Sequence, residues 1–376
     1  MVIDIPNGIV AVKDAARGLA FIALLLPMLG FASLACSPPN SPDGLSENPG
    51  LTAITISPDF ANDGTLLIGT ESNGVFKSTD KGGSWSQSDN SSIESTVYDI
   101  AISPSFDDDG IVYAATERGI FASSDRGASW RFNQSFEIDH TVRIAISPEF
   151  SQNRTLLATA MRKGYSPSTY LWRSRDAGAS WSQLSSGVSY VPGEISFLSD
   201  GSVIGASFES VARSDDMGDT WSIVASGDFS NTASFSPNYD TDGIAFFSDN
   251  LGRASIRMSS RIGEIADLDF KAGFRSICHR IGYGESCSIP PVVSPTFRQD
   301  GTVFASAIMS PEEEAALLRS RDRGASWSVL DVPFTDQAVS IAISPDFDTD
   351  GTVFVATESE LFRSLDSGDT WARVFP

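Results

Sequence analysis

An eight-residue phrase, Ser-x-Asp-x-Gly-x-[Ser/Thr]-Trp, recurs along this chain of 376 residues and constrains its fold more than any other feature. Its six copies are Ser78–Trp85, Ser123–Trp130, Ser174–Trp181, Ser214–Trp221, Ser320–Trp327 and Ser364–Trp371. A seventh, altered copy at Ser259–Ala266 retains Gly263 but has Arg261 and Ala266 in place of the aspartate and the tryptophan. The seven copies start 45, 51, 40, 45, 61 and 44 residues apart, and a period of this size predicts a solenoid or a propeller.

A second phrase, Ile56-Ser57-Pro58-Asp59-Phe60, opens each unit and returns in variant form at 102–106, 146–150, 235–239, 293–297 and 343–347. The fourth unit keeps only 197–201. In the second unit, β-branched runs predict strands at Val97–Ser103, Ile111–Thr116 and Gly119–Ser123, with a fourth opening at Trp130. Asp109-Gly110 predicts a tight turn between the first two strands, and no long helix is expected. Seven such four-stranded antiparallel units predict one all-β domain over residues 51–376, a seven-bladed β-propeller.

The first 35 residues differ in character from the repeats. Lys13 and Arg17 precede the uncharged run Gly18–Ala35, which is typical of a secretory signal peptide. Ser33-Leu34-Ala35-Cys36 resembles the lipobox of bacterial lipoproteins, although Ser33 stands where leucine is usual, and this resemblance implies lipid on Cys36. A retained membrane anchor is the alternative, since 18 apolar residues are just long enough to span a bilayer. Both interpretations place the propeller outside the cytoplasm, at the cell envelope or surface, on a flexible linker of residues 36–50. Without lipid or a retained anchor, the protein would be secreted.

The charge and the cysteines narrow the classes of partner. A formal net charge of −22 and the lack of a lysine-rich patch with interleaved aromatic residues argue against nucleic-acid binding. The membrane is therefore expected to be contacted only through the N-terminal anchor, and the chain is expected to be a monomer. If Cys36 carries lipid, Cys278 and Cys287 remain as an even pair, for which a disulfide is favoured over two free thiols in an oxidising compartment.

The repeated phrase resembles the Asp-box, or BNR repeat, of sialidases, xyloglucanases, sortilin-type receptors and photosystem II assembly-factor-like proteins. The resemblance covers nearly everything after residue 50, implies a propeller, and leaves function open because those families include enzymes, receptors and assembly factors. The Arg-Ile-Pro phrase of sialidases is absent near the first unit, and xyloglucanases pair two propellers where this chain has one. We therefore expect a binding or scaffold protein with no catalytic residues, and the alternative is a glycoside hydrolase with carboxylates at the propeller mouth.

The box residues have a structural explanation that needs no ligand. The aspartate can accept backbone N–H bonds in a turn, the glycine can take a positive φ, and the tryptophan can pack between sheets. These structural residues are Asp80, Trp85, Asp125, Trp130, Asp176, Trp181, Asp216, Trp221, Asp322, Trp327, Asp366 and Trp371. The runs 107–110, 240–243 and 348–351 faintly resemble calcium loops but lack the closing glutamate, so calcium is only an alternative and neither cofactor nor metal ligand is assigned.

Loop lengths indicate which face binds a partner. Loops between strands two and three, and between units, share the face opposite the boxes, and the insertions Met161–Tyr170, Ile265–Pro290 and Met309–Ala316 all fall there. Neutral drift in loop length is the alternative. The expected binding residues on this face, for a protein, peptide or glycan, are Glu71, Glu117, Arg162, Tyr165, Tyr170, Glu209, Asp249, His279, Tyr283 and Glu358. The acids among them follow the second strand and could also reflect simple inheritance of a turn by duplication.

Overall fold

The computed structural model describes most of the repeat region. The described residues are 49–89, 93–136, 140–162, 168–184, 194–207, 210–226, 233–247, 256–261, 264–268, 274–275, 278–280, 285–287, 291–309 and 314–376. All of them belong to one unit of the chain, Pro38–Pro376. The expected signal peptide, Cys36 and most of the linker lie outside the described residues, so these expectations stay predictions.

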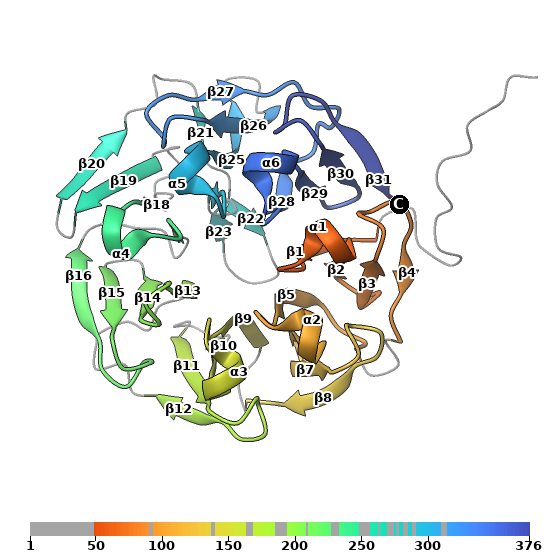
Figure 1. Cartoon of the computed structure of the whole chain (residues 1–376), viewed down its shortest axis with the longest axis vertical. Coiled ribbons are helices and arrows are strands. Elements are labelled where there is room, and N and C mark those ends of the chain that lie inside the picture. Colours follow the sequence, from red (N-terminus) through yellow and green to blue (C-terminus); the bar gives the residue numbers. More distant parts are fainter. Residues whose placement is uncertain are drawn as a thin grey trace, which may run out of the picture. The chain divides into compact units, whose positions relative to one another are not determined.

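Apart from one separate hairpin, the described strands form seven antiparallel sheets, called blades 1 to 7 here, that follow one another around a central axis (Figure 1). Blade 1 contains β1 (Leu51–Ile56), β2 (Leu66–Thr70), β3 (Val75–Ser78) and β4 (Ser86–Gln87), and blade 2 contains β5 (Val97–Ile102), β6 (Val112–Thr116), β7 (Gly119–Ser123) and β8 (Arg131–Gln134). Blade 3 contains β9 (His140–Ile146), β10 (Leu156–Arg162), β11 (Ser168–Ser174) and β12 (Ser182–Leu184), and blade 4 contains β13 (Glu194–Phe197), β14 (Val203–Ala206), β15 (Ser210–Ser214) and β16 (Ser222–Ser226). Blade 5 contains β17 (Ala233–Phe235), β18 (Ala245–Phe247), β19 (Ile256–Arg261) and β20 (Glu264–Leu268). Blade 6 contains β21 (Phe274–Arg275), β24 (Val292–Val293), β25 (Val303–Met309), β26 (Glu314–Ser320) and β27 (Ser328–Val329), and blade 7 contains β28 (Ala338–Ile343), β29 (Val353–Thr357), β30 (Leu361–Ser364) and β31 (Ala372–Phe375).

The prediction of an all-β propeller built from four-stranded antiparallel blades is confirmed. Within the described part of the chain, six sheets have four strands, and blade 6 has five because β25 pairs with both β21 and β24. A separate hairpin, β22 (Cys278–Arg280) and β23 (Glu285–Cys287), follows β21.

A one-turn helix joins the first and second strands of every blade except blade 4. The helices are α1 (Phe60–Asp63), α2 (Phe106–Asp109), α3 (Phe150–Asn153), α4 (Tyr239–Asp242), α5 (Phe297–Asp300) and α6 (Phe347–Asp350). The predicted two-residue turn at Asp109-Gly110 is therefore wrong: Asp109 ends α2, and Gly110 is its left-handed C-cap with φ 60°. The helix forms because Phe106 is buried and because the Asp109 carboxylate accepts hydrogen bonds from the Ser103 hydroxyl and the Ile111 amide. None of the helices in the described residues is long and apolar enough to be a membrane span.

The hydrophobic core lies between neighbouring blades. Leu67 and Val75 of blade 1, for example, pack in one cluster with Val97, Val112 and Trp130 of blade 2. Each sheet thus buries its two faces against two neighbours, which explains why a single repeat could not be stable alone.

Blades 1 and 7 close the ring by packing, without exchanging a strand among the described residues. The Leu51 amide donates to the Glu358 carbonyl at 2.7 Å, and Trp85 Nε1 donates to the Val374 carbonyl at 2.8 Å. The ring of Phe375 lies 5.2 Å from that of Trp85. Side chains from both ends of the domain therefore share one core cluster.

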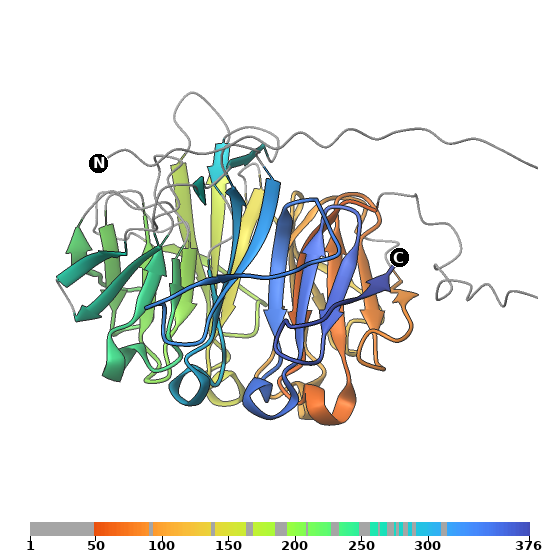
Figure 2. The ribbon, with the colours of Figure 1, turned by 90° about the horizontal axis from the view of Figure 1, so that it is seen from above.

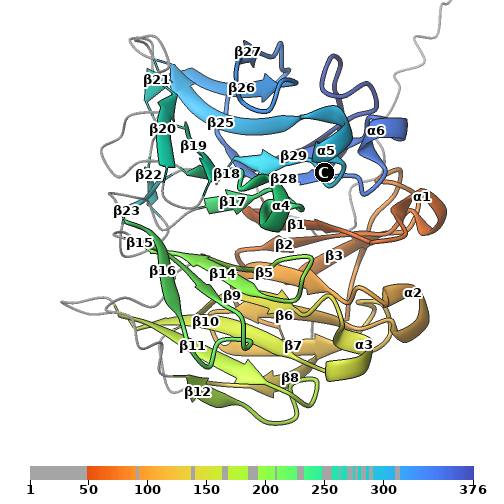
Figure 3. The same cartoon turned by 60° about the vertical axis from the view of Figure 1, so that its left-hand side comes forward.

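The propeller has two unlike faces (Figures 2 and 3). The one-turn helices and the box turns lie on one, called the helix face. The loops between second and third strands, with β21, β22 and β23, lie on the other, called the rim face. The insertion expected from Ile265 is shorter than predicted, because Glu264–Leu268 is the fourth strand of blade 5 and the missing box tryptophan obscured where that strand begins.

Candidate functional site

Each box aspartate has its hydrogen bonds within its own turn. In the fourth box, Asp216 Oδ1 accepts from the Ser214 hydroxyl at 2.8 Å and from the Thr220 amide at 2.8 Å, and Oδ2 accepts from the Thr220 hydroxyl at 2.6 Å. The other five aspartates, Asp80, Asp125, Asp176, Asp322 and Asp366, have the same three partners by position. Three donors on one carboxylate stabilise its charged form.

The pKa values agree with this geometry. The hydroxyl and the amide of Thr220 lower the pKa of Asp216 to about 2, and those of Thr370 do the same for Asp366. A carboxyl group with so low a pKa is ionised throughout the physiological range, so it is poorly suited to act as a general acid.

The tryptophan and the glycine of each box fix the turn onto the preceding blade. All six box tryptophans, Trp85, Trp130, Trp181, Trp221, Trp327 and Trp371, pack in clusters that contain side chains of that blade. A Cβ at Gly127 would lie 3.0 Å from Leu67 of blade 1. The box therefore sets the packing between blades as well as a local turn.

The acidic runs that resemble calcium loops also bond internally. Asp350 Oδ2 accepts from the Ser344 hydroxyl at 2.7 Å and Oδ1 from the Thr352 amide at 2.8 Å, and Asp242 has equivalent partners. No group of three or more His, Cys, Asp or Glu side chains suited to a metal ion occurs in the part of the chain that the structure describes.

Three of the predicted binding acids form an arc on consecutive blades of the rim face. Glu358, Glu71 and Glu117, called the acidic arc here, are exposed in blades 7, 1 and 2. The Glu71 amide donates to the Gly50 carbonyl at 2.8 Å, and the Glu117 amide donates to the Thr96 carbonyl at 3.1 Å. Since Gly50 and Thr96 directly precede the innermost strands β1 and β5, the backbone places these acids beside the mouth of the propeller.

Tyr98 is a member of this site that the sequence did not indicate. It lies at the rim end of β5 and is half-buried. Burial raises the pKa of its phenol, and the carboxylates of Glu117 and Glu71 raise it further. A neutral phenol near two carboxylates offers a hydrogen-bonding, partly apolar surface beside the acidic arc.

The remaining predicted binding residues are less defined. Tyr170 is half-buried in β11. Arg162 lies at the rim end of β10, and His279 lies in β22. Tyr165, Glu209, Asp249 and Tyr283 lie outside the described residues. The hairpin register pairs Cys278 directly with Cys287, a separation that suits the predicted disulfide, which stays a prediction.

A charged row on three adjacent innermost strands was missed by the sequence analysis. Arg143 Nε on β9 lies 3.1 Å from Glu194 Oε2 on β13, and Asp99 Oδ2 on β5 accepts from the Ile144 amide at 3.0 Å. The side chains of Arg143 and Glu194 are 31% and 18% exposed. Asp99, Arg143 and Glu194, called the inner triad here, thus link blades 2, 3 and 4 near the axis.

Burial dominates the electrostatics of the inner triad. It raises the pKa values of Glu194 and Asp99, although Arg143 opposes this. Glu194 in turn raises the pKa of Arg143. The signal was present in the sequence, because each member stands four residues before the residue that directly follows its strand, which is Ser103, Ser147 or Leu198. At the equivalent positions blades 1 and 7 have the uncharged Ala53 and Ser340.

Part of the chain is similar in sequence to a sortilin family model. The family model described as Sortilin-Vps10 (Sortilin, neurotensin receptor 3) matches residues 73–246, which is less than half of the chain. A comparison with curated proteins finds no significant match.

Solved structures with the same fold include enzymes and binding proteins. The GH74 xyloglucanase of Xanthomonas campestris has 17% identity and a TM-score of 0.63, and the match covers 87% of this chain and 55% of the enzyme. This chain therefore spans about half the length of that enzyme. YCF48 bound to D1 peptide has 15% identity and a TM-score of 0.56, covering 85% of this chain and 94% of YCF48. The extracellular domain of a putative hybrid two component system from B. thetaiotaomicron has 11% identity and a TM-score of 0.57, covering 86% and 39%. At such identities the likeness extends to the fold alone.

Proposed function

We propose that this β-propeller, whose repeats resemble those of the BNR/Asp-box superfamily, is an exported, non-catalytic binding protein. Its rim face recognises a protein or peptide partner that carries basic side chains. The observation that carries the proposal is the gathering of three exposed carboxylates on the rim face. Glu358, Glu71 and Glu117 are exposed on three consecutive blades, and the backbone bonds of Glu71 and Glu117 place them beside the innermost strands. Exposed like charges at a propeller mouth attract oppositely charged partners.

Tyr98 supports a peptide rather than a lone cation as the ligand. Its ring adds apolar area near the carboxylates of Glu71 and Glu117, and tyrosine is enriched where proteins bind one another. The propeller of YCF48, which was solved with a D1 peptide, is consistent with a fold of this kind holding a peptide. A glycan with neutral or basic sugars is the other partner class.

Neutralising the acidic arc is expected to weaken binding of a basic peptide. The probe is a labelled peptide of alternating lysine and glycine, measured by fluorescence anisotropy at physiological ionic strength. Glu71→Gln with Glu117→Gln should weaken its affinity about tenfold, since exposed charge pairs contribute up to about 1 kcal/mol each. The matched control is Asp108→Asn with Glu149→Gln, which removes the same charge from exposed positions on the helix face.

Equal weakening by the two double variants would show that only net charge matters and would overturn the rim-face site.

The alternative function is glycoside hydrolysis, and one observation favours it. The inner triad holds two carboxyl groups whose pKa values are raised by burial, as a glycoside hydrolase requires of its acid. Turnover of xyloglucan by the wild-type protein, lost in Glu194→Gln, would replace binding with hydrolysis.

Export and lipid anchoring rest on the sequence of residues 1–36 and are tested on the protein from its native membrane. Intact-mass spectrometry should find a chain that begins at Cys36 with added lipid mass, and the Cys36→Ser variant should lose that mass and leave the membrane fraction. The same spectrum, recorded without reductant, should be two hydrogens lighter than the reduced protein because of the Cys278–Cys287 bond. An unprocessed N-terminus, or two free thiols, would contradict these proposals.

A further inference from the structure

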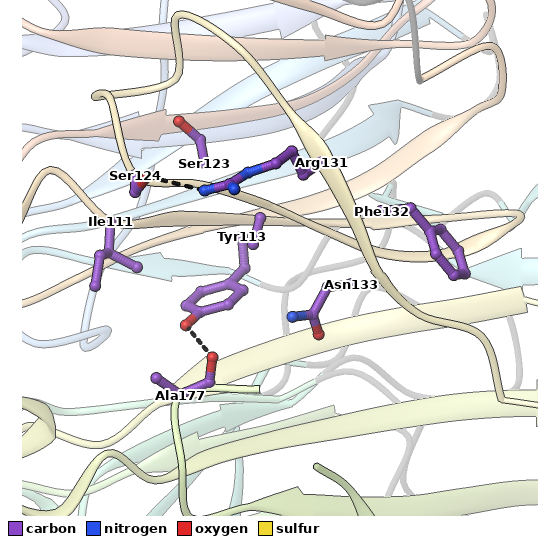
Figure 4. A pocket seen from close by; sticks show the side chains of 9 residues that line it. Ile111, Tyr113, Ser123, Ser124, Arg131, Phe132, Asn133 and Ala177 are labelled. Carbon is purple, nitrogen blue, oxygen red and sulfur yellow. Dashed lines mark hydrogen bonds between the residues drawn. The ribbon is translucent and has the colours of Figure 1, made fainter. Parts of the chain in front are cut away.

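A pocket of about 340 Å³ lies between blades 2 and 3, beside the box turns that contain Ser124 and Ala177 (Figure 4). Its walls include Ile111, Tyr113, Ala122, Arg131 and Asn133 of blade 2, and Ala177 of the third box. The volume is within the range of about 300 to 1,000 Å³ that small-molecule sites occupy.

At three other interfaces between blades, an arginine of the third strand reaches across to the next box. Arg173 Nη1 donates to the Met217 carbonyl at 3.0 Å, and Arg363 Nη1 donates to the Lys81 carbonyl at 2.6 Å. Arg319 bonds the Ser367 carbonyl in the same way. The accepting residue always directly follows the box aspartate. Arg173 and Arg319 also bind Asp219 and Asp369, each at 2.7 Å.

In blade 2 the arginine lies on the fourth strand and the small residue on the third, the opposite of blade 3. Ala122 takes the place of the third-strand arginine, and Arg131 stands opposite it on β8, where blade 3 pairs Arg173 with Ser182. The carbonyl of Ala177 is instead bonded by the Tyr113 hydroxyl at 2.8 Å, shown as a dashed line in Figure 4. The pocket is therefore the space that an arginine side chain fills elsewhere. Ala179 replaces the acid that would pair with such an arginine.

A polar residue also replaces an apolar one on the outer strand. A Cβ added to the box glycine would contact Leu184 at the blade 3–4 interface and Leu330 at the blade 6–7 interface, but at this interface the neighbour of Gly178 is Asn133. Asn133 Oδ1 accepts from Trp181 Nε1 at 3.2 Å, which directs the amide oxygen to the tryptophan. Among the described residues its Nδ2 group has no hydrogen-bond partner.

We propose that this pocket binds the carboxylate of a small organic acid, with Arg131 and Asn133 as donors. The only hydrogen bond of the Arg131 side chain to the described residues is to Ser124 Oγ at 3.5 Å, the limit of a useful contact (Figure 4). The guanidinium fork can therefore take a carboxylate in bidentate geometry. Ile111, Ala122 and the Tyr113 ring supply the apolar wall for the rest of the acid.

The surrounding charges favour a ligand with a single negative charge. Asp109 and Asp176 lie near Tyr113, as does Arg154, so the local field is mixed. Both carboxylates are bonded within their own turns. In a chain of net charge −22, each further negative charge on a ligand is disfavoured. A monocarboxylate is thus expected to bind better than inorganic phosphate.

The test titrates the whole domain with benzoate, acetate and inorganic phosphate, followed by ligand-observed NMR. Benzoate should bind better than acetate because of the apolar wall, and Arg131→Ala should weaken it at least about tenfold. Arg175→Ala is the matched control, because Arg175 is 58% exposed and pairs with Asp219 at the next interface. This variant should leave benzoate binding unchanged.

A second variant is designed to fill the pocket while the net charge of the protein stays the same. Ala122→Arg with Arg131→Ser recreates the cross-strand pair of blade 3, so it should keep the thermal unfolding temperature while closing the pocket to benzoate. Benzoate binding that survives this double variant or Arg131→Ala would overturn the proposal. So would tighter binding of phosphate than of benzoate, or the absence of binding by all three probes.

Discussion

Gly119→Ala is expected to lower the free energy of unfolding by about 4 kcal/mol, the range that core clashes reach. Gly119 begins β7 with φ 128°, and a Cβ there would clash with the backbone oxygen of Gln134 on β8. A backbone atom cannot move aside as a flexible side chain can, so β8 would have to leave its register. Urea denaturation followed by tryptophan fluorescence measures the loss.

Gly201→Ala is the matched control for this prediction. Gly201 also has a positive φ, 82°, but nothing would lie within 4 Å of a Cβ at this position. This variant should lose only the cost of a strained backbone, about 1 to 2 kcal/mol. Similar losses in the two variants would mean that backbone strain alone, and not contact with Gln134, makes glycine necessary at 119.

Arg143→Met is expected to destabilise the propeller by about 2 kcal/mol at neutral pH. Removing one member of a buried ion pair costs about 3 to 5 kcal/mol, and the partial exposure of Arg143 and Glu194 reduces this. The loss arises because Glu194 and Asp99 remain near the axis without a cation. Arg175→Met, at a pair in which both side chains are about half exposed, should cost less than about 1 kcal/mol.

The stability loss caused by Arg143→Met is expected to depend on pH in one direction. Burial already raises the folded-state pKa values of Glu194 and Asp99, and without Arg143 nothing in the triad opposes it. A carboxyl whose folded pKa exceeds its unfolded value of about 4 binds its proton more tightly when folded, so stability falls as the pH rises through that window. The difference between wild type and Arg143→Met should therefore shrink from pH 8 to pH 5. A difference that grows on acidification would contradict the role assigned to Arg143.

The local structure of the repeats was largely predictable. Gly119–Ser123 was predicted as a strand and is β7, and the prediction of four-stranded antiparallel blades is confirmed. Asp109-Gly110 was misread because a Gly after Asp suits both a hairpin turn and a helix C-cap, and only the burial of Phe106 decides between them.

The candidate sites were predictable only in part. The acids Glu71 and Glu117 could be placed on the rim face because they follow the second strand in each unit. The sequence could not associate Tyr98 with these acids. Tyr98 lies near Glu71 of blade 1 and Glu117 of its own blade only because β5 packs at the rim end of the folded propeller. The pocket at Arg131 could not be predicted from the sequence either. It exists because the arginine stands on β8 and not on the third strand, and this difference is recognised only when the interface is compared with the other interfaces between blades.

The amino-acid sequence by itself determined the repeat, the strand pattern and the turn chemistry, because each box completes its hydrogen bonds within eight residues. Asp216 needs only Ser214 and Thr220, which are its near neighbours in the chain. The tertiary structure alone decided which charged groups meet. Asp99, Arg143 and Glu194 lie on different blades and come together only when adjacent blades bury their faces against each other, since that packing sets the distance between innermost strands.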